Sequence, residues 1–329
     1  MGMYVAFLAV AGLIVLAFLG VQAAGLHFLF GALIPYIAFF IFVIGFAYRV
    51  YLWGTSAVPF RIPTTAGQMQ SFPWVKSNKF DNPSNGFGVV VRMALEILLF
   101  RSLFRNTKSE IHDGRLIHGS DKWLWLFGLM FHYSFLIIFI RHFRLFLENV
   151  PGFILIIESL DGFFQAGVPF VYLTDLMIVA AATFLFARRV LLPQIRYISM
   201  AADYFPLFLI LGIAFTGILM RYFIRVDITG AKQVIIGLVS FQPAPSAEIG
   251  VIFYIHLFLV STLLAYFPFS KLMHMGGVFL SPTRNLANNS RMVRHVNPWN
   301  PDVHVHTYAE YEDEFRDKMK QVGIPVEKE

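Results

Sequence analysis

Long apolar stretches dominate this chain of 329 residues. A helix needs about 20 mostly apolar residues to cross the hydrocarbon core of a bilayer. Six stretches reach that length and predict membrane-spanning helices, at residues 3–24, 28–53, 122–146, 167–190, 203–224 and 249–272. The pattern therefore predicts an all-α integral membrane protein with six transmembrane helices.

One further stretch is nearly apolar enough to span. Residues 87–104 carry Arg92, Glu96 and Arg101 and have basic residues on both flanks. We interpret this stretch as an interfacial helix that lies on the membrane surface, with Arg92 paired to Glu96 one turn later. It belongs to one long connection, residues 54–121.

The C-terminal segment has a different character. Residues 278–329 include a proline-punctuated run at 296–301 and a charged stretch at 308–320 that predicts a short helix. About 50 such residues cannot bury a core of their own, so they either lie along a partner protein or form a disordered tail. We therefore divide the chain into 1–27, an N-terminal transmembrane helix and turn, 28–277, a membrane core, and 278–329, a cytoplasmic tail.

The composition agrees with a membrane protein and narrows its chemistry. The chain is 57% hydrophobic and only 14% charged, whereas about 25% of the residues of a soluble domain are charged. It has no cysteine, which excludes disulfides, cysteine-held iron–sulfur clusters and thioether-linked haem. Any haem must then be non-covalent, which favours type b. No basic stretch is interleaved with aromatic residues, so we expect no nucleic-acid partner.

The distribution of positive charge predicts the topology. With six spans, 21 of the 26 Lys and Arg residues lie on one side of the membrane. Cytoplasmic connections are enriched in Lys and Arg, so we assign that side to the cytoplasm. The prediction is a multi-pass protein of the cell membrane with both termini cytoplasmic.

Four of the ten histidines lie within or at the ends of predicted spans. They are His132 and His142 on the third span and His256 and His274 at the sixth. An ionisable side chain at membrane depth is costly and suggests a function. The alternative is a neutral core histidine bonded to a neighbouring helix, which explains one such residue more easily than two pairs.

The spacing predicts two cross-helix pairs. His132 and His142 are about 15 Å apart along a helix, and His256 and His274 about 27 Å. Because the two spans run antiparallel, His142 pairs with His256 near the outer side and His132 with His274 near the inner side. The unequal rises require tilt or an irregular helix end around Pro268. Two separate two-ligand sites suit two bis-histidine haems better than zinc or copper, which needs three or four converging ligands. Such haems have no open iron position, so electron transfer is expected.

Haem propionates need cationic partners. Arg141, Arg144 and Arg221 lie at outer span ends and Lys271 at the inner end of the sixth span. Each is a candidate propionate-binding residue, and each could instead be an interfacial anchor.

The histidine spacings and their surroundings resemble a known family. FGLMFHYSFLIIFIRHF (127–143), FYIHLFLVSTLLAYFPFSKLMHMGG (253–277) and LFLILGIAFTGILMRY (207–222) resemble the dihaem cytochromes b of the respiratory nitrate reductase gamma-subunit family. The resemblance covers a five-helix core, about 28–277, and leaves the first span as an addition.

The tail carries a second resemblance. GGVFLSPTRNLANNSR (276–291), HVNPWNPDV (295–303) and HTYAEYEDEFRDKMK (306–320) resemble the membrane cytochrome b family (DsrM, also called HmeC) of the Dsr/Hme complexes of sulfate reducers. This resemblance implies two haem b groups and electron exchange with menaquinol. It also implies a cytoplasmic iron–sulfur partner similar to heterodisulfide reductase, in a quinone-linked oxidoreductase complex with periplasmic multihaem and iron–sulfur subunits.

A quinol site needs a proton acceptor near a haem. Asp175, about two turns into the fourth predicted span, is the intramembrane carboxylate that we assign to this role. A hydrogen bond to a neighbouring helix or haem group is the alternative explanation. The direction of electron flow stays open.

Two other functions remain as alternatives. The histidines could be relay groups of a transporter or proton channel, but such proteins usually carry ionisable groups and broken helices at the bilayer midplane. Here those groups cluster near span ends. The chain could also be a membrane anchor with structural haem, which suits the tail equally well.

Overall fold

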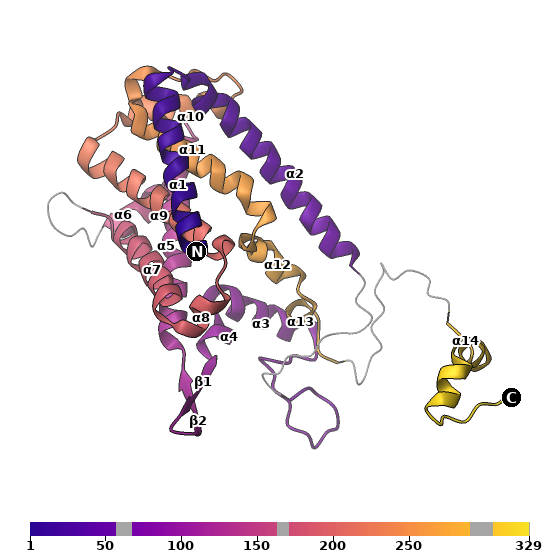
Figure 1. Cartoon of the computed structure of the whole chain (residues 1–329). Coiled ribbons are helices and arrows are strands. Elements are labelled where there is room, and N and C mark those ends of the chain that lie inside the picture. The colour runs from indigo at the N-terminus through magenta and orange to yellow at the C-terminus, as the bar shows by residue number, and fades with distance from the viewer. Residues whose placement is uncertain (57–67, 163–170, 290–304, 329) are drawn as a thin grey trace. The chain divides into compact units, whose positions relative to one another are not determined.

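The computed structural model describes residues 1–56, 68–162, 171–289 and 305–328. The chain is mostly helical (Figure 1). It forms two compact units. The bundle unit comprises Met1–Tyr51 and Val90–Phe279, and the second unit comprises Leu52–Val89 and Leu280–Glu329.

Five helices in the described part of the chain are long and apolar enough to cross a membrane. Each of them includes a π-helical or 3₁₀ turn at one end. They are Gly2–Ala23, which contains α1 (Gly2–Phe18); Leu29–Thr55, with α2 (Ile34–Thr55); Lys122–Leu145, with α5 (Lys122–His142); Ala201–Ile224, with α9 (Ala201–Ile218); and Val251–Phe269, with α11 (Val251–Tyr266). These helices confirm the membrane fold that the apolar stretches predict.

The fourth expected span corresponds to helix α7, Leu173–Leu191. Its predicted start, at residue 167, lies outside the described residues. With 19 residues α7 is about 28 Å long, close to the thickness of a bilayer core, although Asp175 and two C-terminal arginines make it less apolar than the others. It packs along α5 and α9, so it belongs to the same bundle.

The remaining elements are short. The helices are α3 (Gly86–Leu99), α4 (Arg101–Phe104), α6 (Gly152–Gly162), α8 (Pro193–Ile198), α10 (Ile228–Val239), α12 (His274–Leu280), α13 (Pro282–Asn285) and α14 (Tyr308–Gln321), and the strands are β1 (Thr107–His112) and β2 (Arg115–Ser120).

The stretch expected to form one interfacial helix is broken at Phe100. This residue has φ 50° and ends α3 in the left-handed region, so the chain turns before α4 begins. The Glu96 carboxylate then accepts hydrogen bonds from the backbone N–H and the hydroxyl of Ser102. The break therefore produces two helices, of which α3 is the longer.

The β-hairpin was not predicted. Strands β1 and β2 pair antiparallel, with His112 opposite Arg115, around Asp113 and Gly114. Both turn residues have positive φ, 49° and 73°. An Asp-Gly pair favours this two-residue turn, so the sequence contained a signal for the hairpin.

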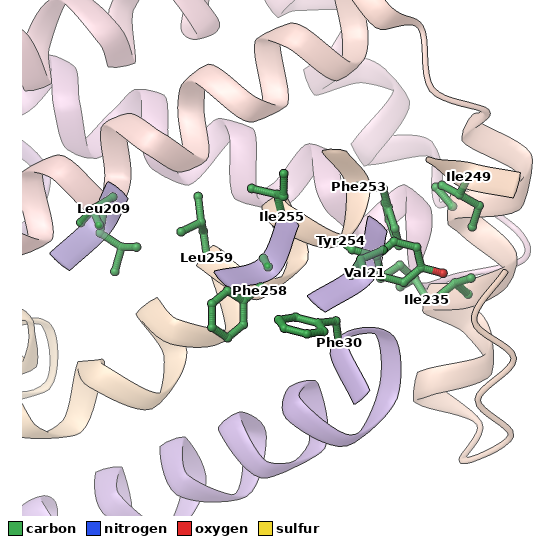
Figure 2. Close-up of a cluster of buried hydrophobic side chains, with 14 residues drawn as sticks. Val21, Phe30, Leu209, Ile235, Ile249, Phe253, Tyr254, Ile255, Phe258 and Leu259 are labelled. Atoms are coloured by element: carbon green, nitrogen blue, oxygen red, sulfur yellow. The ribbon is translucent and has the colours of Figure 1, made fainter. Parts of the chain in front are cut away.

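The bundle core lies where the first two spans, Gly2–Ala23 and Leu29–Thr55, meet α11 (Figure 2). The rings of Phe30 and Phe258 meet edge to face with centroids 5.2 Å apart, and Leu209 and Leu259 are completely buried. A Cβ atom at Gly20 would lie 2.4 Å from the Phe30 ring, so a glycine is required there. Because this packing joins the first span to α11, the first span is an integral part of the bundle.

In the described C-terminal residues, one carboxylate holds the segment after α14 against that helix. Helix α14 forms where the charged stretch predicts a helix and begins with a capping box between Thr307 and Glu310. The buried Glu312 accepts hydrogen bonds from the backbone N–H groups of Glu327, at 2.7 Å, and Lys328, at 2.8 Å. The segment after α14 is thereby folded back onto the helix. The proline-punctuated run at 296–301 lies outside the described residues.

These contacts predict a pH dependence of the tail. The N–H of Glu327, together with Lys328 and Arg316, holds the pKa of Glu312 below its ordinary value of 4.5. A lowered folded-state pKa stabilises the closed segment above about pH 4.5, and this stabilisation is lost as pH falls through the folded value. Hydrogen exchange at Glu327 and Lys328, corrected for intrinsic rates, should therefore be slow near neutrality and accelerate in that acidic range.

The substitution Glu312→Gln should accelerate exchange at these two amides several-fold at neutral pH, whereas Glu314→Gln, on an exposed position of the same helix, should not. Equal exchange in the wild type and in Glu312→Gln would show that this carboxylate does not hold the segment.

Candidate site: two histidine pairs in the helix bundle

The four intramembrane histidines all belong to the bundle unit. His132 lies in the middle of α5 and His142 is its last residue. His256 lies in the second turn of α11, and His274 is the first residue of α12. Between them the helix breaks into two 3₁₀ turns separated by Ser270, which is extended at φ −118° and ψ 175°. The irregular helix end expected around Pro268 is therefore present.

The first pair joins the end of α5 to α11. The rings of His142 and His256 are nearly parallel, at 11°, with centroids 6.4 Å apart. His256 also faces α9, where a Cβ atom on Gly217 would lie 3.4 Å from its Cε1 atom.

The second pair joins the middle of α5 to α12. The rings of His132 and His274 have centroids 5.9 Å apart and are nearly perpendicular, at 82°. Phe100, which ends α3, packs edge to face on His132 at 4.9 Å, and Phe131 does so at 5.3 Å. The structure thus brings together the two pairs that the antiparallel helix order predicts.

Hydrogen bonds determine which ring nitrogen is available in three of these residues. The Nδ1 atoms of His132, His142 and His274 lie 2.7, 2.7 and 2.8 Å from the backbone carbonyls of Gly128, Ile138 and Lys271. A carbonyl only accepts, so each Nδ1 carries the proton. The Nε2 atom then presents its lone pair, which is the form of histidine that binds metals.

His256 reaches the same state through a side chain. Its Nδ1 lies 2.9 Å from the hydroxyl oxygen of Thr216 on α9. That hydroxyl lies 2.8 Å from the carbonyl of Gly212 and 3.0 Å from that of Ile213, and it donates its proton to these carbonyls. Its oxygen is therefore an acceptor for the His256 N–H, and Nε2 is again free.

The separations of the rings fit an iron atom between them. Two metal–nitrogen bonds of about 2 Å and about 1.1 Å from each nitrogen to its ring centre give roughly 6.2 Å between ring centres. The two pairs, at 6.4 and 5.9 Å, lie on either side of this value. Among the described residues no three His, Cys, Asp or Glu side chains gather as a metal site. Each pair is therefore a two-ligand arrangement, which suits a haem iron whose other four positions the macrocycle fills.

A buried ionic network lies beside His142. The Arg141 guanidinium, with a side chain only 9% exposed, donates to Asp161 of α6 at 2.5 Å and to Asp175 of α7 at 3.4 Å. It also stacks on the Tyr172 ring at 3.8 Å. Asp161 in turn accepts the hydroxyl of Thr174 at 2.6 Å. The network joins the end of α5 to α6 and α7.

Asp175 is fully engaged in this network. Its Oδ2 accepts the hydroxyl of Tyr222 at 2.5 Å, and its Oδ1 faces Arg141. Tyr222 belongs to the π-helical turn Leu219–Ile224 that follows α9, and such turns are frequent at functional sites. Arg141, which Asp175 faces, is the residue that precedes His142 in the chain. The carboxylate therefore belongs to the network beside the first pair and is hydrogen-bonded to a neighbouring helix.

The other expected propionate partners differ in whether a carboxylate already pairs with them. Arg144 pairs with Glu158, and Lys271 donates to Asp203 at 2.6 Å. Arg221 is exposed and lies over the Tyr172 ring at 4.2 Å, with no carboxylate partner in the part of the chain that the structure describes. Of the four candidate cations, Arg221 is thus the one whose charge is not already matched there.

Two residues of this site have no role in the sequence-based prediction. Thr216 and Tyr222 both lie in the stretch 207–222, which resembles the family but assigns neither residue a contact. A hydroxyl on one span can be recognised in the sequence as a possible partner for a histidine on another span. To identify the pair, however, one must know how each helix is rotated about its axis.

The network predicts a contrast between two carboxylates. Asp161→Asn should leave Arg141 with only the longer contact to Asp175 and should destabilise the protein by about 1.5–3 kcal/mol, because a buried hydrogen bond to a charged group is lost. Glu158→Gln affects a more exposed pair and should cost at most about 1 kcal/mol. Thermal unfolding in detergent should show the larger drop for Asp161→Asn. A similar drop for both variants would contradict the assigned difference in burial.

Comparison with known proteins gives the family. A model of the nitrate reductase gamma subunit family matches residues 88–296. A protein of Archaeoglobus fulgidus named Hdr-like menaquinol oxidoreductase cytochrome b-like subunit is 46% identical over 280 residues, which cover 83% of this chain and 84% of the relative. A protein of the same name from Archaeoglobus profundus is 45% identical over 277 residues, 82% of each chain. The chain therefore belongs to the nitrate reductase gamma subunit family and to the family of these cytochrome b-like subunits.

Proposed function

We propose that this chain is a dihaem b electron-transfer subunit that exchanges electrons between menaquinol or menaquinone and an iron–sulfur partner. The observation that carries the proposal is the geometry of the two histidine pairs, with ring centres 6.4 and 5.9 Å apart and every Nδ1 atom bonded. The names of the relatives, which contain cytochrome b-like and menaquinol oxidoreductase, support the same function.

The four histidines would be the axial ligands of the two groups. His142 and His256 would hold one haem, and His132 and His274 the other. When bound, haem carries single electrons on its iron. The chain would contribute the two Nε2 atoms of each pair, one from each of two helical segments. Arg221 is the proposed propionate partner of the first haem, since Arg141, Arg144 and Lys271 each face a carboxylate.

Menaquinol oxidation releases two electrons and two protons, and the chain must accept the protons. Asp175 is the proposed proton acceptor, because it pairs with Arg141, the residue next to His142, and accepts the hydroxyl of Tyr222. Tyr222 would pass a proton to or from it. The same residues serve menaquinone reduction if electrons run in the opposite direction.

The complex around the subunit follows from charge and resemblance. The excess of Lys and Arg supports a cytoplasmic location for both termini. The tail would lie along a cytoplasmic iron–sulfur subunit similar to heterodisulfide reductase. Further membrane and periplasmic multihaem or iron–sulfur subunits would complete a complex of sulfate respiration.

The haem assignment can be tested with double variants and pyridine haemochrome quantification. The wild type should hold two haems per chain. His142→Ala combined with His256→Ala should retain one, because both residues serve the same haem. His142→Ala combined with His132→Ala should retain none. His27→Ala, at a half-buried histidine in the turn after the first span and outside both pairs, should retain both.

Absence of haem b from the wild type would overturn the proposed function. Retention of one haem by the cross-pair variant, with loss of both by the His142/His256 variant, would overturn the pairing.

The role of Asp175 can be tested by stopped-flow reduction with a menaquinol analogue. Asp175→Asn should slow reduction of the haems by at least about 100-fold, the usual contribution of a proton-transferring side chain. Reduction by dithionite and haem content should stay normal. Asp227→Asn is the matched control, since this residue only caps α10 and asparagine caps equally well. Normal quinol-dependent reduction in Asp175→Asn would remove this carboxylate from the mechanism.

A further inference from the structure

His256 differs from the other three histidines in what holds its Nδ1 atom. His132, His142 and His274 bond to backbone carbonyls three or four residues earlier in their own segment. His256 bonds to the side chain of Thr216, which is 40 residues away and lies on a different helix. A single substitution can therefore remove this hydrogen bond without altering the backbone of α11.

The orientation of the Thr216 hydroxyl is fixed by its own helix. Two carbonyls, of Gly212 and Ile213, lie within 3.0 Å of its oxygen and can only accept. The hydroxyl proton points to them, and the oxygen lone pairs remain for the N–H of His256. The acceptor for this histidine is thus the hydroxyl oxygen of Thr216, whose orientation two carbonyls of α9 fix.

The packing around Thr216 limits the access of water to this contact. Thr216 is 8% exposed, and α9 and α11 pack along each other. Gly217 leaves the His256 ring room beside the hydroxyl. In so dry a setting a ring N–H without an acceptor is costly, so loss of the hydroxyl would disturb the ring itself.

We propose that Thr216 is a positioning residue that holds His256 with Nε2 toward His142 and raises its strength as an axial ligand. This inference rests on the proposed haem ligation. An acceptor on the second nitrogen of a ligating histidine raises its basicity and favours the oxidised metal. Thr216 therefore keeps the potential of the haem at the His142/His256 pair lower than it would be without the hydroxyl. The haem at the other pair is unaffected, because its ligands use backbone carbonyls.

The test compares Thr216→Val, which keeps the shape and removes the hydroxyl, with Thr216→Ser, which keeps the hydroxyl. Each is made in two backgrounds. His132→Ala leaves only the His142/His256 haem, and His142→Ala leaves only the other. Redox titration followed in the visible spectrum gives the potential, and retention of haem during dilution in detergent gives its affinity.

In the His132→Ala background, Thr216→Val should raise the haem potential and weaken haem retention by about 10-fold, the lower end of the effect of such partners. Thr216→Ser should behave as threonine does. In the His142→Ala background, Thr216→Val should change neither quantity, which also shows that the variant folds.

An unchanged potential and unchanged retention in Thr216→Val with His132→Ala would overturn the inference and leave the proposed function intact. Equal effects in the two backgrounds would also overturn it, since they would indicate a general loss of folding. Absence of haem b from the unsubstituted chain would overturn the proposed function and this inference together.

Discussion

The arrangement of the bundle depends on one requirement: the ring nitrogens of an imidazole need hydrogen-bond partners where no water is present to supply them. Each neutral histidine has one donor and one acceptor nitrogen, and a bilayer offers no partner for either. In three of the four residues the helix itself supplies the partner, because a carbonyl has a second lone pair after its backbone hydrogen bond. Once Nδ1 is satisfied in this way, Nε2 keeps its lone pair, and the helices bring two such imidazoles to ring-centre distances of 6.4 and 5.9 Å.

A second constraint acts at the end of the bundle near His142. Arg141 is adjacent to this histidine in sequence and carries a charge that burial makes costly. Carboxylates from α6 and α7 pair with it, and the Tyr222 hydroxyl of the π-helical turn after α9 donates to one of them. The same contacts that offset the charge therefore also join three segments to the end of α5, beside His142.

The parts of the fold that depend on a single physical quantity could be predicted from the sequence. Apolar length determines the spans, and antiparallel order determines which histidines meet. The unequal rises of about 15 and 27 Å are reconciled at Ser270, where an extended residue interrupts the helix before His274. The position of that break was predictable from Pro268, but its geometry depends on packing against neighbouring segments.

Partners of individual side chains were harder to predict. Arg141 and Lys271 were expected to face propionates because both lie at span ends, yet carboxylates on other helices already match them. Which carboxylate faces which cation depends on the rotation of each helix about its axis, and hydropathy carries little information about rotation. For the same reason the contact between Thr216 and His256 could not be identified from the spacing of histidines on a single helix.

The two pairs have similar ring-centre distances but differ in the angle between their ring planes. Those of His142 and His256 are nearly parallel, and those of His132 and His274 nearly perpendicular. Parallel imidazoles lift the degeneracy of the iron d orbitals that overlap with them, whereas perpendicular imidazoles leave them closely spaced. In the proposed dihaem state, two sites of identical composition would therefore have distinct electron paramagnetic resonance signals, rhombic at the first pair and strongly axial at the second.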